Sequence, residues 1–244
     1  MAFCEYIRIV DNAKKAIVFI HGIVGHAGFF KEFVELVPDD CSIYNVLLDG
    51  HGKGVKEFSR ASMKKWESQV KSIVDKLSST HDEIYMVGHS MGTLLSIEQA
   101  SKNPCVKKMF LMSIPAKVFV TPRLIKIIIK VYFNKVNPNN EIAMASKEYY
   151  GCTERKSPFS YIPWSFRIFE LFGKIRRTKK LLPKIKTPAY VYQSVKDEVV
   201  SKRSIKYLKK HSNFNVHSLN NSWHCYHTKE EKKFLLDEFI NFIK

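Results

Sequence analysis

The sequence predicts an α/β protein with a mostly parallel central sheet flanked by helices and one helical insertion. Short apolar runs typical of buried strands alternate with longer segments of helical periodicity. The alternation stops over residues 114–184, where no strand pattern is visible. It resumes at residues 189–193, which indicates that the chain then returns to the same sheet.

The segment before the insertion supplies most of the predicted sheet. Its first strong strand, residues 16–20, is apolar throughout and ends at His21-Gly22. Ligands of parallel sheets bind beyond the carboxyl ends of the strands, so we expect functional residues directly after strands. Further strands are expected at 42–48, 84–87 and 106–112, and helices at 29–37, 59–77 and 91–101. The helix over 59–77 has an apolar face of Ala61, Val70, Ile73, Val74 and Leu77.

Residues 1–113 and 185–244 are predicted to form the core, and residues 114–184 a helical cap. The cap segment is rich in aromatic and basic residues. Thr228 and Glu231 form a capping box at the start of the last helix. After the cap, strands are expected at 189–193 and 213–218, and helices at 202–210 and 228–243.

The chain is strongly basic, with a net charge of +17 from 40 Lys and Arg against 23 Asp and Glu. Such a balance suits a protein that binds nucleic acid, an anionic membrane surface or acidic substrates. The lysines are spread along the chain and no nucleic-acid recognition motif is present. Solvated surface charge is therefore favoured, and no nucleic-acid partner is expected.

Cysteine usage and hydropathy indicate a soluble cytoplasmic protein. The cysteines are odd in number and none has C-x-x-C spacing, which argues against a disulfide framework and a zinc site. No signal peptide is expected, and the most apolar stretch, residues 124–133, is too short to span a bilayer. The five cysteines are Cys4, Cys41, Cys105, Cys152 and Cys225.

Ser90 lies in Gly88-His89-Ser90-Met91-Gly92, between a predicted strand and a predicted helix. This is the setting of a nucleophile elbow, a strained turn that presents a serine hydroxyl. Glycines flank the serine because a Cβ there would strike the neighbouring strand and helix. The helix N-terminus favours negative charge that develops beside the serine. We therefore predict that Ser90 is a catalytic nucleophile.

A serine nucleophile needs a histidine base and a carboxylate that orients it. In this arrangement the acid and then the histidine follow the serine along the chain. Asp197 follows the strand at 189–193 and is the predicted acid, with its neighbour Glu198 as the rival. His224 follows the last predicted strand and is the predicted base, with His227 as the rival.

The other histidines are not assigned to the predicted site. His211 and His217 are expected on the surface, and His51 and His89 as loop residues without a special role.

Two backbone N–H groups are needed to bind the oxyanion of a tetrahedral intermediate. Met91 follows the nucleophile, and Ile23 lies in the glycine-containing loop after the first strong strand. We predict these two as the oxyanion donors. Ile23, Phe29 and Met91 are also expected to contact the acyl group of the substrate.

Taken together, these residues resemble the α/β-hydrolase superfamily, in particular bacterial carboxylesterases and monoacylglycerol lipases. The similar segments are His21-Gly22-Ile23, Asp49-Gly50-His51-Gly52, the Ser90 elbow, Asp197-Glu-Val-Val and Ser222-Trp-His224. The resemblance implies a Ser90–His224–Asp197 triad, an oxyanion hole at Ile23 and Met91, and a helical cap. The chain departs from the family in two places: the family often has a glycine near Ser194, before the acid, and a glycine at the position of Trp223.

The expected reaction is hydrolysis of a small carboxylic ester, of short to medium chain length or a monoacylglycerol, through an acyl-enzyme. It requires no metal and no organic cofactor. A thioesterase or acyltransferase with the same triad is one alternative, and a non-catalytic lipid- or small-molecule-binding protein on the same fold is another. Lys126 and Lys130 share a helix face, so weak association of the basic cap with membrane surfaces is a further possibility.

Overall fold

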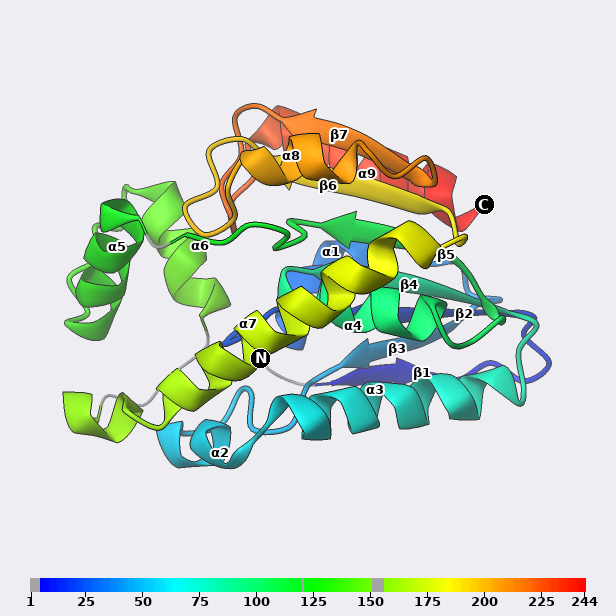
Figure 1. Cartoon of the computed structure of the whole chain (residues 1–244), viewed down its shortest axis with the longest axis horizontal. Helices are drawn as coiled ribbons and strands as arrows, with labels where there is room; N and C mark the ends of the chain where they lie inside the picture. The colour runs from blue at the N-terminus through cyan, green and yellow to red at the C-terminus, as the bar shows by residue number, and fades with distance from the viewer. Residues whose placement is uncertain (1–4, 120, 151–155) are drawn as a thin grey trace.

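A computed structural model describes residues 5–119, 121–150 and 156–244. Within these residues seven strands form one sheet in the order β1-β3-β2-β4-β5-β6-β7 (Figure 1). β1 pairs antiparallel with β3, and the other pairs are parallel. The predicted fold class is thus confirmed. The strands are β1 (Tyr6–Arg8), β2 (Lys15–Ile20), β3 (Ser42–Val46), β4 (Glu83–His89), β5 (Val106–Met112), β6 (Ala189–Ser194) and β7 (Phe214–Leu219).

Helices cover both faces of the sheet, because the central strands are apolar on both sides (Figure 1). On one face α3, α4, the second half of α7, and α8 bury the larger apolar cluster, which includes Trp66. On the other face α1 and α9 bury a second cluster around Phe33 and Phe239. The helices of the core are η1 (Ala27–Phe30), α1 (Lys31–Val34), α2 (Val55–Arg60), α3 (Met63–Ser78), α4 (Met91–Ala100), α8 (Arg203–Leu208) and α9 (Lys229–Ile243).

The regular elements of the insertion between β5 and β6 are helices in the part that the structure describes, apart from an isolated bridge between Val118 and Val200. Leu171 and Ile175 on α7 belong to the larger core cluster, so the second half of this helix packs on the core. The division into core and cap at residue 184 stays a prediction. The elements of the insertion are α5 (Pro122–Tyr132), α6 (Glu141–Tyr149), η2 (Pro158–Tyr161), α7 (Trp164–Leu181) and η3 (Leu182–Lys184).

Two local features differ from the sequence expectation. The short edge strand β1 was not expected, since three residues are too few for a periodic signal. The helix expected over 59–77 is two helices, because the backbone at Ala61 is extended and Ser62 caps α3 by accepting the N–H of Lys65. The predicted apolar face of that segment is nonetheless buried, from Ala61 to Leu77.

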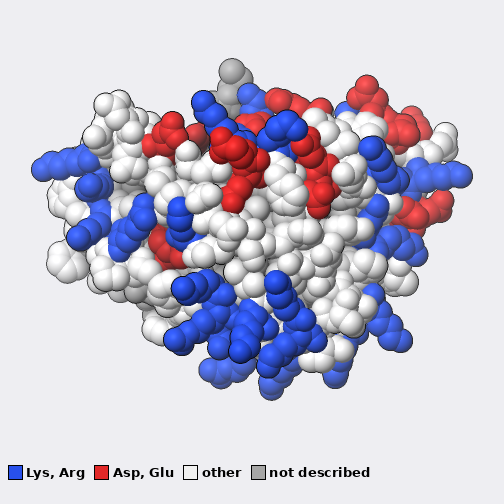
Figure 2. All heavy atoms as spheres, turned by 90° about the horizontal axis from the view of Figure 1, so that it is seen from above, with Lys and Arg blue, Asp and Glu red and all other residues white. Residues whose placement is uncertain are grey.

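The basic residues are less evenly distributed in space than along the chain. Residues 199–229 contain no Asp or Glu. Figure 2 shows Lys and Arg side chains gathered along one edge of the molecule without acidic neighbours.

Cys41, Cys105 and Cys225 are free, and Cys4 and Cys152 lie outside the described residues. No helix in the described part of the chain is long and apolar enough to cross a membrane.

Candidate active site

Ser90 lies at a strained turn between β4 and α4. Its backbone φ is +52°, a left-handed value that a serine adopts only under constraint. A Cβ at Gly92 would lie 1.9 Å from the carbonyl oxygen of Ile20, and one at Gly88 would lie 2.9 Å from the backbone of Thr93. The two glycines therefore let the turn pack tightly against β2 and α4, as the sequence pattern predicts.

The three residues predicted as a triad are brought together by the loops after β4, β6 and β7. The Oγ of Ser90 lies 3.1 Å from Nε2 of His224, and Nδ1 of His224 lies 2.8 Å from Oδ2 of Asp197. The other carboxylate oxygen of Asp197 accepts the backbone N–H groups of Val199 and Val200 at 2.8 and 2.7 Å. The carboxylate is thus fixed by its own loop and directed at the imidazole.

The electrostatic environment favours a basic imidazole. Burial lowers the pKa of His224, but the charge and hydrogen bond of Asp197, with the charge of Glu198, outweigh it and raise the pKa above its usual value. Burial raises the pKa of Glu198. Glu198 accepts the backbone N–H of His224 at 3.2 Å. Glu198, the rival for the acid, is therefore buried against the main chain of His224 rather than its imidazole.

The loop after β2 is held by hydrogen bonds on either side of Ile23. The carbonyl of Gly22 accepts Nδ1–H of His21 at 2.8 Å, and the N–H of Val24 donates to Nε2 of His51 at 3.2 Å. Val24 has a φ of +60°, which a β-branched residue rarely adopts. Among the described residues, neither the N–H of Ile23 nor that of Met91 has a protein acceptor. Both donors are therefore available to a ligand.

Buried histidines shape the site more than the sequence suggested. The expectation that His89 lies in a loop is wrong, because it is the last residue of β4. His51 bonds to the Val24 loop, and Nε2 of His89 bonds to the carbonyl of His224 at 2.9 Å. Burial lowers the pKa of His51 to about 4, so its ring stays neutral and able to accept. His227 is half-buried rather than exposed, and burial lowers its pKa to about 4. His217 is likewise half-buried and stacks on Tyr192.

The residues expected to contact substrate differ in their exposure. Ile23 and Phe29 are half-buried beside the site, and the ring of Phe29 lies 4.2 Å from that of His89. The side chain of Met91 is fully buried in the larger core cluster. Tyr149 of α6, which sequence reasoning missed, reaches the site, with its hydroxyl 2.8 Å from Nδ1 of His89. Its position depends on cap docking, for which the sequence carries no local signal.

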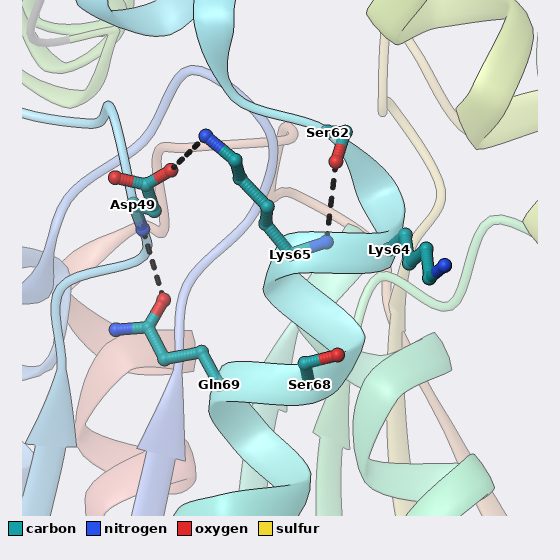
Figure 3. Close-up of a pocket in the computed structure, with 6 residues that line it drawn as sticks. All are labelled: Asp49, Ser62, Lys64, Lys65, Ser68 and Gln69. Carbon is teal, nitrogen blue, oxygen red and sulfur yellow. Dashed lines mark hydrogen bonds and ion pairs between the residues drawn. The ribbon is translucent and has the colours of Figure 1, made fainter.

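The three residues predicted as a triad are covered in this structure. Ser90, Asp197 and His224 are each no more than 5% exposed. An open hollow lies elsewhere, beside the N-terminus of α3 (Figure 3). There Lys65 pairs with Asp49 at 3.5 Å, and Gln69 accepts the N–H of Asp49 at 2.9 Å. These contacts fasten the loop after β3 to α3 and involve none of the triad residues.

Comparison with known proteins gives the family. Residues 11–231 match the family described as serine aminopeptidase, S33. The chain belongs to this family. A monoglyceride lipase homolog of Monkeypox virus is 24% identical in an alignment of 265 residues, gaps included, that covers 99% of this chain and 93% of that protein.

Solved structures agree with this S33 assignment at the level of the fold. A monoacylglycerol lipase of Paleococcus ferrophilus has a TM-score of 0.69 at 16% identity, covering 99% of both chains. A structure from work on LipS and LipT, two metagenome-derived lipolytic enzymes, has a TM-score of 0.72 at 19% identity and covers 99% and 97% of the two chains. Est1E of Butyrivibrio proteoclasticus with bound ferulic acid has a TM-score of 0.64 at 17% identity, over 98% and 93%. The chain is thus a member of the S33 family with the same fold as these lipolytic enzymes and esterases.

Proposed function

We propose that the protein hydrolyses small carboxylic esters, with Ser90 as nucleophile, His224 as general base and acid, and Asp197 as the orienting carboxylate. The observation that carries this proposal is the continuous chain of contacts from Ser90 Oγ through both nitrogens of His224 to Asp197, at 3.1 and 2.8 Å. Each distance is that of a hydrogen bond that can transfer or orient a proton.

In the proposed reaction His224 removes the proton of Ser90 as Oγ attacks the ester carbonyl. The carbonyl oxygen becomes an oxyanion, which accepts hydrogen bonds from the N–H groups of Ile23 and Met91. His224 then donates its proton to the leaving alcohol, and the acyl group stays on Ser90. Water, deprotonated by His224, then attacks the acyl-enzyme carbonyl. The bond to Ser90 Oγ breaks, His224 returns the proton to Oγ, and the carboxylic acid leaves.

The proposed substrates are short- to medium-chain acyl esters or monoacylglycerols. Two apolar residues support an acyl chain there: Phe29 packs against His89, the residue before Ser90, and Ile23 follows Gly22, where an added Cβ would lie 2.8 Å from that of Ser90. The relative from Monkeypox virus and the enzyme from Paleococcus ferrophilus are named for monoglyceride and monoacylglycerol lipase activity, which is consistent with this class.

A fluorophosphonate probe tests the nucleophile, and an ester chain-length series tests the substrate. We expect the probe to label Ser90 in the folded protein, and Ser90→Ala to lose both labelling and hydrolysis. A folded wild-type protein that neither reacts with the probe nor hydrolyses any ester would be a binding protein. Preferred turnover of thioesters, or faster acyl release with an added alcohol, would identify a thioesterase or an acyltransferase.

We further propose that the cap associates weakly with membrane surfaces. On α5 Ile125, Ile128 and Ile129 are spaced on one helix face and are each about half exposed, at 47, 52 and 51%. Lys126 and Lys130 are exposed on the same helix. An apolar helix face next to lysines suits the boundary between acyl chains and anionic headgroups.

A further inference from the structure

Tyr149 is the last residue of α6 and is the point at which the cap reaches the groups around Ser90. Its side chain is 4% exposed. The ring lies 5.2 Å from Phe29 and 5.1 Å from His89, measured between ring centroids. A Cβ added to Gly22 would lie near both the Tyr149 hydroxyl and the side chain of Ser90. The hydroxyl and the serine therefore flank the same glycine.

The hydrogen bonds of Tyr149 have only one consistent set of directions. The carbonyl of His224 can only accept, so Nε2 of His89, at 2.9 Å, carries the hydrogen. Burial holds the pKa of His89 well below its usual value, so the ring is neutral and Nδ1 is an acceptor. The Tyr149 O–H therefore donates to Nδ1 at 2.8 Å. Its oxygen in turn accepts the N–H of Gly22 at 3.1 Å.

Helix α6 is tied at both ends to the loops that carry the site. Next to Tyr149, the carbonyl of Glu148 accepts Nε2–H of His26 at 2.8 Å. At the other end, Glu141 accepts the hydroxyl of Tyr226, two residues after His224. The hydroxyl of Tyr149 thus occupies a fixed place between the two loops.

We propose that Tyr149 is a positioning residue for the reaction proposed above, on which this inference rests. Its hydroxyl donates to Nδ1 and so stabilises the tautomer of His89 that the carbonyl of His224 requires, and His89 then holds that carbonyl. The same hydroxyl holds the N–H of Gly22, so that the neighbouring N–H of Ile23 stays directed at the oxyanion. Docking of α6 therefore completes the geometry of both the base and the oxyanion donors.

The tautomer of His89 provides a direct test on the wild-type protein. Proton–nitrogen NMR of histidine ring nitrogens distinguishes the two neutral tautomers, and His89→Gln assigns the signals. We expect the hydrogen on Nε2, and a change in the Nδ1 resonance in Tyr149→Phe, which lacks the donor. A hydrogen on Nδ1, or an Nδ1 resonance identical in both proteins, overturns the proposal.

Kinetics separate positioning from a merely structural role. For a soluble ester, Tyr149→Phe is expected to lower kcat by about tenfold and to change KM by less than about twofold. Tyr132→Phe is the matched control, because it removes a cap hydroxyl that donates to the carbonyl of Lys156 at 2.9 Å. It is expected to match the wild type in kcat.

The outcomes are distinguishable. A wild-type protein that hydrolyses no ester overturns the proposed function. A wild-type protein that hydrolyses esters, with Tyr149→Phe equal to it in kcat or lowered only in thermal stability, overturns the role of Tyr149 alone.

Discussion

The backbone N–H of His224 donates to Oε2 of Glu198 over 3.2 Å. Nδ1 of the same histidine forms a hydrogen bond of 2.8 Å with Oδ2 of Asp197, the residue before Glu198. Two consecutive carboxylates therefore hold one histidine in different ways, the first through its imidazole and the second through its main chain. This division predicts unequal effects of removing the two charges.

Asp197→Asn is expected to lower kcat by about 10³- to 10⁴-fold, because the imidazole loses the anion that selects its tautomer and stabilises its protonated form. Glu198→Gln keeps an oxygen that can accept the N–H of His224, so this substitution is expected to lower kcat by less than about tenfold. Steady-state kinetics on a soluble ester compare the two. A larger loss for Glu198→Gln would reverse the assigned roles.

The activity is expected to fall on the acid side as His224 becomes protonated and can no longer act as a base. The pKa of His224 is raised above 6.5, so the midpoint of this fall in kcat/KM is expected above pH 6.5. Asp197→Asn removes the main cause of the increase. Its residual activity is expected to have a lower midpoint, and an unchanged midpoint would show that another group governs the profile.

Protein stability is expected to decrease between about pH 6.5 and pH 4. The unfolded chain protonates His51 near pH 6.5, whereas the folded protein keeps it neutral down to about pH 4. The unfolded state thus binds the extra proton, and this residue alone lowers the free energy of unfolding by about 3 kcal/mol across that range. Urea unfolding at several pH values measures the slope. His51→Gln retains an acceptor for the N–H of Val24 and is expected to make the free energy of unfolding less dependent on pH. An equal slope in both proteins would show that His51 does not cause the dependence.

Two glycine substitutions are expected to act in opposite directions. Gly92→Ala places a Cβ 1.9 Å from the backbone oxygen of Ile20. It is expected to prevent folding or to lower the free energy of unfolding by about 3 kcal/mol or more. Gly173→Ala adds a Cβ inside α7, 3.7 Å from the nearest atom, which is the flexible end of Arg177. It is expected to raise stability by about 0.5–1 kcal/mol. Chemical unfolding compares both with the wild type, and a well-folded Gly92→Ala would refute the close packing of the elbow.

Membrane association predicts that α5 carries a lipid-binding face. Ile128→Ser with Ile129→Ser is expected to reduce co-sedimentation with vesicles that contain anionic lipid, while hydrolysis of a soluble ester stays unchanged. Phe234→Ser is the matched control, since Phe234 is an exposed apolar residue of α9, outside the cap. Binding that is equal for neutral and anionic vesicles, or insensitive to the α5 changes, would count against the proposal.

The sequence by itself determined the six parallel strands and the order of the chemical groups along the chain, but not the edge strand β1 or the break between α2 and α3. Apolar runs identify strands because a strand that is buried on both faces of a parallel sheet needs apolar side chains on both sides. The elbow around Ser90 is recognisable because the tight turn itself requires its glycines. Asp197 and His224 could be predicted as partners of Ser90 because parallel strands bring their carboxyl ends to one edge, so that residues distant in the chain meet there.

Tertiary structure decided the contacts that no local pattern records. The bond from His51 to Val24 and that from Tyr149 to His89 join residues 27 and 60 positions apart. These contacts depend on how loops and the cap dock, and docking is a property of packed surfaces rather than of sequence periodicity. The separate roles of Asp197 and Glu198 were decided in the same way, since adjacent carboxylates differ only in the direction in which the folded loop points them.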